Sequence, residues 1–275
     1  MAKGLVRKSI VVISLVVGVS FWIKSNLEPR VNELKITVTD SGHLDDVLKV
    51  AVLSDLHVSE SRKNIEDLEI LIAEVVARDP DLVLFLGDFV SSPRFISDMR
   101  AHREALLSIL NIDAEIPSLF VLGNYESWSN REAWRQSFIN HSLLVLENQI
   151  VELETRKGLI CIRGLGDAHT GYFQYIDFSK SCESKARLTI THDPAGASHD
   201  EIKGLVFAGH THCGQISIPF VGPLWVPSEA PESAWCGLLR LEDRVIYTSA
   251  GVGHSILPIR IGTHAEWDLI TVEFE

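Results

Sequence analysis

Several apolar segments of this chain end in an aspartate, a histidine or an asparagine, and this pattern constrains the fold most. The run VLKVAVLSDLH ends with Asp55 and His57, DLVLFLGDFV contains Asp88, and SLFVLGN ends at Asn124. Unbroken runs rich in β-branched residues are typical of strands buried on both faces. Because ligands bind at the carboxyl ends of the strands in open α/β sheets, the pattern predicts a ligand site there.

Two amphipathic helices are predicted between these strands. NIEDLEILIAEVVARDP places apolar residues on one helical face, namely Ile65, Leu68, Ile72, Val75 and Val76. Pro80 ends this helix, and SDMRAHREALLSIL predicts the second one. The first half of the chain is therefore expected to alternate strand and helix, as in an α/β domain.

The second half of the chain predicts further strands. ARLTITHDP ends just after His192, and GLVFAGHTHCGQ contains His210 and His212. CGLLRLEDRVIYTSA and WDLITVEFE alternate apolar and polar residues, which predicts hairpin strands. Two β-rich halves flanked by helices imply two packed sheets covered on their outer faces.

Seven polar residues follow apolar runs in this way: Asp55, His57, Asp88, Asn124, His192, His210 and His212. Four imidazoles, two carboxylates and one amide oxygen suit a pair of divalent transition ions, and one aspartate can bridge both. Two such ions, two carboxylates and a bridging hydroxide together leave a net charge of about +1, which attracts phosphate. Such a site also activates its own nucleophile, because metal-bound water has a pKa near ~7.

The other histidines are predicted to have structural roles, because an isolated histidine is more often a satisfied buried group than a ligand: His43, His102, His141, His169, His199 and His264.

The succession D-x-H, G-D, G-N, His and G-H-x-H over residues 55–212 resembles the calcineurin-like metallophosphoesterase family. The resemblance implies an α/β fold, a four-layer α/β/β/α sandwich of two mixed sheets. It implies a metal-dependent phosphoesterase with two divalent ions (Mn, Fe, Zn or Mg). One ion would be bound by Asp55, His57, Asp88 and His212. The other would be bound by Asp88, Asn124, His192 and His210, so that Asp88 bridges.

Two later segments, GHTHCGQISIPFVG and GVGHSILPIR, resemble a membrane-associated bacterial branch of this family. That branch includes phosphodiesterases and UDP-diacylglucosamine pyrophosphatases of lipid A synthesis. Cys213 stands where the branch usually has glycine and is interpreted as an inert small residue, the alternative being an oxidisable thiol beside the metals. His254 and Arg260 are candidate phosphate contacts.

Asn124, Tyr125 and His192 are the predicted catalytic residues. Relatives usually carry histidine at the position of Tyr125. A phenol, with a pKa of ~10, is a weaker proton donor than an imidazolium with a pKa of ~6.5. The tyrosine therefore predicts a preference for leaving groups that need no proton, such as those of pyrophosphates and aryl esters. The alternative is an aromatic side chain that fills the wall of the cleft.

The predicted function is hydrolysis of phosphodiester or pyrophosphate bonds in a membrane-proximal or lipid-linked substrate. An apolar stretch after the metal histidines either packs in the core or forms a lip for acyl chains: Ile216, Ile218, Phe220, Val221, Leu224, Trp225 and Val226. The alternatives are a phosphatase or phosphodiesterase for soluble substrates and a non-catalytic metal-binding scaffold. A formal net charge of −12 argues against a nucleic-acid partner. The four cysteines show no C-x-x-C spacing and predict neither a zinc knuckle nor a redox pair.

The N-terminal segment 1–24 is predicted to be a membrane anchor or a signal segment. Basic residues precede the apolar run of residues 9–23, which at ~22 Å is short of the ~30 Å hydrocarbon core. The favoured localisation is the inner membrane, with a single-pass anchor and the domain on the outer, periplasmic side. The alternatives are the cytoplasmic face and secretion after cleavage. Residues 25–45 are expected to form a linker and a leading strand, and residues 46–275 the phosphoesterase domain.

Overall fold

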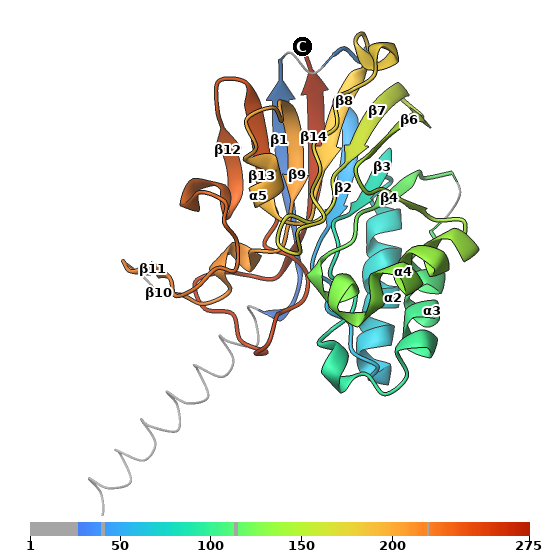
Figure 1. The fold of residues 1–275 in the computed structure, drawn as a ribbon, viewed down its shortest axis with the longest axis vertical. Helices are drawn as coiled ribbons and strands as arrows, with labels where there is room; N and C mark the ends of the chain where they lie inside the picture. The colour runs from blue at the N-terminus through green and yellow to red at the C-terminus, as the bar shows by residue number, and fades with distance from the viewer. Residues whose placement is uncertain (1–26, 40–41, 113–114, 219) are drawn as a thin grey trace, which may run out of the picture.

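Two six-stranded mixed sheets pack face to face in the computed structural model, which describes residues 27–39, 42–112, 115–218 and 220–275 (Figure 1). The first sheet has the order β1 (Arg30–Val38), β14 (Glu266–Phe274), β2 (Leu48–Leu53), β3 (Leu82–Phe85), β4 (Ser118–Phe120) and β5 (Leu144–Val145). The second has the order β12 (Gly237–Arg240), β13 (Arg244–Thr248), β9 (Gly204–Ala208), β8 (Ala186–Ile190), β7 (Gly158–Gly164) and β6 (Gln149–Thr155). The predicted fold class is confirmed.

Three helices cover the outer face of the first sheet: α2 (Arg62–Ala77), α3 (Met99–Leu110) and α4 (Asn124–Asn140) (Figure 1). The side chains of Ser61 and Asp98 accept backbone N–H groups at the starts of α2 and α3, as N-cap residues do. The predicted face of α2 is confirmed, since Leu68, Ile72 and Val75 are buried against the sheet.

The outer layer of the second sheet is thinner. It contains the one-turn helix α5 (Pro194–Ala197) and the 3-10 helix η4 (Glu232–Ala234), whose Ala197 and Ala234 pack on Val206 and Ile246. The connection between β8 and β9 spans only residues 191–203, which leaves room for a single helical turn.

The central core lies between the sheets. Alternate residues of each strand point into it, because side chains of a strand alternate between its two faces. The fully buried members include Val50, Val52, Leu82 and Leu84 from the first sheet and Ile160, Ile162, Leu188 and Ile190 from the second. The opposite faces of β2 and β3 are covered by the helices, so these strands are buried on both sides, as their unbroken apolar runs predict.

The C-terminal strands are only partly as expected. β12 and β13 form an antiparallel hairpin, which confirms the prediction for that segment. β14 does not extend this hairpin but lies in the first sheet, parallel to β1 and antiparallel to β2. The leading strand β1 is paired with β14 along its whole length, and the short strands β10 (Ser217–Ile218) and β11 (Gly222–Pro223) form a separate hairpin.

The predicted localisation is contradicted. Within the described ranges, none of the helices has the length and apolar character needed to cross a bilayer. The expected anchor, residues 9–23, lies outside the described residues.

The four cysteines form two disulfides, Cys161–Cys182 and Cys213–Cys236, at sequence separations of 21 and 23 residues. The interpretation of Cys213 as an inert small residue is therefore wrong. Its bridge ties the loop after β9 to the turn before β12. Closing a loop of this length is worth about 3 kcal/mol in the chain-entropy account. Cysteines this far apart carry no local signature, so the fold alone reveals their pairing.

Asp268 on β14 links the two sheets inside the core. Its Oδ1 accepts hydrogen bonds from Tyr247 Oη on β13 at 2.6 Å and from Asn32 Nδ2 on β1 at 3.0 Å. Burial, together with the nearby negative charge of Glu266, raises the pKa of Asp268 to about 7. The carboxyl group is thus protonated in the folded protein at a pH where it is ionised in the unfolded chain.

We predict that Asp268→Asn raises the free energy of unfolding progressively as the pH increases. The wild-type side chain contributes its full stability below its unfolded pKa of ~4 and loses it as the pH rises through about 7, whereas the amide is always neutral. The variant should match the wild type near pH 4 and exceed it by about 2–4 kcal/mol at pH 8, as measured by urea unfolding. Glu273→Gln, on the same strand, is the control and should show no such gain. A difference independent of pH would contradict the assignment.

Candidate metal centre

The structure brings all seven predicted ligands together where strands of both sheets end. Each residue follows its strand directly: Asp55 and His57 after β2, Asp88 after β3, Asn124 after β4, His192 after β8, and His210 and His212 after β9. None of their side chains is more than 7% exposed. A buried cluster of this composition requires compensating charge or hydrogen bonds.

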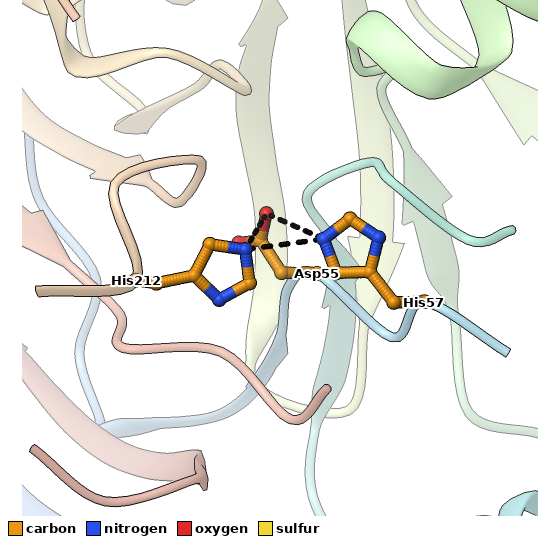
Figure 2. A group of neighbouring side chains, drawn as sticks. All are labelled: Asp55, His57 and His212. Atoms are coloured by element: carbon orange, nitrogen blue, oxygen red, sulfur yellow. Dashed lines mark hydrogen bonds and ion pairs between the residues drawn. The ribbon is translucent and has the colours of Figure 1, made fainter. Parts of the chain in front are cut away.

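Asp55, His57 and His212 form one group (Figure 2). His57 Nε2 lies 3.1 Å from His212 Nε2. Asp55 Oδ1 lies 3.5 Å from His212 Nε2 and 3.8 Å from His57 Nε2. Asp55 Oδ1 is buried and accepts no hydrogen bond from any described residue. Two imidazole nitrogens and an unpaired carboxylate oxygen facing one point fit a divalent cation.

Asp88, His192 and His210 form the second group, beside Asn124. His192 Nε2 is 3.1 Å from Asn124 Oδ1 and 3.5 Å from Asp88 Oδ1. The other carboxylate oxygen, Asp88 Oδ2, is 3.7 Å from Nε2 of His57 in the first group. Asp88 thus presents one oxygen to each group, which is the geometry that a bridging carboxylate needs.

Hydrogen bonds outside the cluster orient two of the imidazoles. His192 Nδ1 lies 2.6 Å from the carbonyl oxygen of Leu86, and His210 Nε2 lies 2.7 Å from that of Pro227. Each of these nitrogens must donate to its carbonyl, so the lone pair is left on the other ring nitrogen. His192 therefore offers Nε2 to a metal and His210 offers Nδ1.

Arg260 lies behind the first group and does not line the cavity. Its buried guanidinium donates to His212 Nδ1 at 3.1 Å and to the carbonyl oxygens of Ala250 and Gly251 at 2.7 and 2.9 Å. If Nδ1 accepts this bond, the ring hydrogen of His212 lies on Nε2. A cation at Nε2 would require that hydrogen to move to Nδ1, which would break the bond from Arg260. The other candidate phosphate contact, His254, also lies outside the cavity lining, although its neighbour Ser255 belongs to it.

Glu126 supports Asp88 and was not identified from the sequence. Its carboxylate accepts the backbone N–H groups of Asp88, Phe89 and Gly123 at 2.8, 2.9 and 2.9 Å. Burial and the nearby charge of Asp88 raise the pKa of Glu126 to about 7. The signal is present in the sequence, because Glu126 stands three residues after Gly123, where a capping box places its acid.

The ligand loops have an unusual backbone. Five of the seven residues have a positive φ, between 45° and 68°: Asp55, His57, Asp88, His210 and His212. Non-glycine residues rarely adopt this region, and each costs of order 1–3 kcal/mol. Such strain persists where the surrounding structure determines the conformation, and it clusters at functional sites.

Tyr125 lies at the edge of the first group. Its ring centroid is 4.7 Å from that of His57, and its hydroxyl is 3.0 Å from Ser255 Oγ. Burial raises the pKa of Tyr125, so the phenol is neutral near pH 7. Its backbone N–H also donates to Asp88 Oδ1 at 2.9 Å.

A cavity of about 680 Å³ opens over the cluster. One part of its wall is apolar and exposed, with Leu224 at 60%, Trp225 at 66% and Ile256 at 77%. His169 also lines it, 4.7 Å from His210 between ring centroids, so the purely structural role expected for this histidine does not describe its position. His169 comes after Asp167 in the loop that follows β7, so the strand-end pattern does not single it out.

Comparisons with known proteins agree with this geometry. A family model for calcineurin-like phosphoesterases matches residues 48–214, and the chain belongs to that family. It is a metal-dependent hydrolase of phosphoesters that uses two divalent metal ions.

Three relatives extend the comparison. The uncharacterized metallophosphoesterase YkuE of Bacillus subtilis is 27% identical over 269 residues, which cover 94% of this chain and 92% of that protein. Phosphodiesterase YaeI of Escherichia coli is 29% identical over 224 residues, or 79% of each chain. A transmembrane protein with metallophosphoesterase domain from Danio rerio is 24% identical over 284 residues, covering 96% of this chain and 62% of that protein.

Proposed function

We propose that the protein hydrolyses phosphodiester or pyrophosphate bonds in a substrate that carries an apolar, lipid-like group. The observation that carries this proposal is the position of the buried ligand cluster beneath a cavity whose wall is largely apolar. The similarity to a protein named phosphodiesterase supports a diester as substrate. The later segments resemble a branch that includes pyrophosphatases of lipid A synthesis, and this resemblance supports the lipid-linked part.

We propose that Asp55, His57, Asp88 and His212 hold one metal ion. Asp88, Asn124, His192 and His210 hold the other. When bound, the two ions supply positive charge for the phosphate and an activated water at neutral pH. The chain's own contribution is to fix the ligand positions through Glu126 and the carbonyl-bound histidines.

Asp88→Asn tests the metal centre. We expect loss of at least one ion and a fall in turnover of at least ~100-fold, because the change removes a negative charge and one metal-facing oxygen. Metal content by emission spectroscopy and the rate with an aryl phosphodiester and added Mn²⁺ would be measured together. Asp81→Asn is the matched control. Asp81 is a buried aspartate directly before the start of β3, whereas Asp88 follows its end, and this variant should keep both ions. Full occupancy with wild-type turnover would exclude the proposed bridge.

Tyr125 is proposed to donate a hydrogen bond without transferring its proton. Its hydroxyl is neutral and lies beside the metal ligands, within reach of Ser255. A neutral phenol can stabilise a phosphoryl oxygen but is a poor acid for an alkoxide. The enzyme should therefore favour leaving groups of low pKa, such as a phosphomonoester, whose last pKa is ~6.

A series of aryl and alkyl leaving groups, graded by pKa, tests this role. The wild type should show a steep dependence of kcat on leaving-group pKa. Tyr125→His should show a shallower dependence, with gains of about tenfold or more for the poorest leaving groups, since general acids contribute 10²–10⁴-fold. Tyr125→Phe keeps the ring but removes the hydroxyl. It is the control for the interpretation that the aromatic side chain only fills the wall of the cleft. Equal slopes in wild type and Tyr125→His would mean that the residue only fills the wall.

The apolar wall is proposed to bind the lipid part of the substrate. We expect kcat/KM for p-nitrophenyl alkyl phosphates to rise about threefold to fourfold per methylene until the wall is covered, because each buried methylene contributes ~0.8 kcal/mol. The double variant Leu224→Ala, Trp225→Ala should flatten this rise. The control variant Ile70→Ala changes a similarly exposed apolar residue on α2 and should leave the rise unchanged. Independence of chain length in the wild type would point to soluble substrates.

A further inference from the structure

The cavity above the ligand cluster contains one cationic side chain among the described residues that line it, that of Arg94. Arg94 belongs to the 3-10 helix η1 (Pro93–Phe95), which follows β3 and therefore Asp88. It is exposed, and in the described part of the chain its guanidinium forms no hydrogen bond or ion pair.

The path of the chain from Asp88 to Arg94 is well defined. Val58 and Val90 form a parallel bridge, and Ser91 N donates to the carbonyl oxygen of Val58 at 2.9 Å. The segment that leads to η1 is thus hydrogen-bonded to the segment that follows Asp55 and His57. Arg94 and the ligands consequently border one cavity of about 680 Å³, which is the size of a single ligand site.

The charges of the site indicate what Arg94 recognises. Two divalent ions carry four positive charges, and the carboxylates of Asp55 and Asp88 cancel two of them. The hydroxide nucleophile and one ionised phosphodiester cancel the remaining two. Counting only the ions and their direct ligands, a single phosphate balances the metal centre, and the described residues that line the cavity include no acid besides Asp88 to pair with Arg94. A diphosphate diester brings one more negative charge, which Arg94 would neutralise.

We infer that Arg94 binds the second phosphate of a diphosphate diester whose first phosphate lies at the metal centre. The inference rests on the proposed function and narrows its substrate class to phosphoanhydrides. A guanidinium matches this role because its planar fork binds phosphate oxygens in pairs. Trp225 and Ile256, apolar residues that line the same cavity, reduce the volume open to water there, which favours the contact.

The reaction gives Arg94 a part in turnover as well as in binding. Water adds across the P–O–P bridge: its oxygen forms a bond to the phosphorus at the metal centre, and the bridging oxygen leaves with the second phosphate. The two hydrogens of the water end on the two product monophosphates or in solvent. Negative charge increases on the leaving phosphate as the bond breaks, so Arg94 stabilises the transition state more than the ground state.

Arg94→Gln tests the inference with two hydrolysable substrates and two inert probes. We expect kcat/KM for P¹,P²-diphenyl diphosphate to fall about 10- to 100-fold, the value of a charged hydrogen-bonded pair. The same variant should change kcat/KM for p-nitrophenyl phenyl phosphate, which has one phosphate, less than about threefold. Arg94→Lys should restore part of the diphosphate activity, since it keeps the charge but not the fork.

Calorimetry supplies a readout that does not depend on turnover. Mn²⁺-loaded Arg94→Gln should bind P,P′-diphenyl methylenediphosphonate, which cannot be hydrolysed, about tenfold or more weakly than wild type. Its affinity for diphenyl phosphate should be unchanged. Arg100→Gln, an exposed arginine in the first turn of α3 that does not line the cavity, is the matched control and should behave as wild type.

Equal losses for the one-phosphate and two-phosphate ligands, or no loss for either, would overturn the assignment of Arg94. Failure of the wild type to hydrolyse any phosphoester would instead overturn the proposed function. The calorimetric comparison would then still decide whether Arg94 binds a second phosphate.

Discussion

The two groups of ligands depend on the placement of Asp88. One of its oxygens faces His192 and the other faces His57, and these histidines come from different sheets. The distance between the groups is therefore set by how closely the sheets pack, and the interior between them is dense with fully buried aliphatic side chains. Protein interiors resist small displacements because they are packed as tightly as organic crystals. The core thus holds the positions of the candidate ligands.

The backbone around Asp88 shows how little freedom this arrangement leaves. A Cβ on Gly123 would lie 2.3 Å from Asp88 Oδ1, and one on Gly209 would lie 1.7 Å from Ser54 Oγ. Both glycines stand directly before a candidate ligand, Asn124 and His210 respectively. The G-N and G-H pairs in the sequence are therefore steric requirements of the cluster. The left-handed conformations of the candidate ligands are offset by the surrounding sheets and by the four backbone N–H groups that donate to Glu126.

Features that depend on local patterns could be predicted from the sequence, whereas those that depend on distant segments could not. Hydrophobic runs, helical periodicity and strand ends predict β2, β3, α2 and the clustering of the seven candidate ligands. The helix α4 was missed, because it is largely polar, is kinked at Asn130, and buries little beyond Trp134 and Phe138 after its first turn. The place of β14 in the first sheet and both disulfides are set by tertiary contacts. His169 and Arg94 could not be singled out from the sequence, because the cavity that both line is formed by loops far apart in the chain.

The cavity combines a weak proton donor with a permanent positive charge, and this combination limits the chemistry that the site can accelerate. A group that must leave as an alkoxide needs a proton, and the neutral phenol of Tyr125 supplies one poorly. A phosphate that leaves as an anion needs charge stabilisation instead, and a guanidinium, which stays charged, provides it. Apolar walls make this electrostatic route more effective, since a lower local dielectric strengthens the attraction between the leaving anion and Arg94. Beside the same walls, a second phosphate without a partner would be unfavourable. Arg94 can therefore both raise the rate of hydrolysis and favour substrates with two phosphates over those with one.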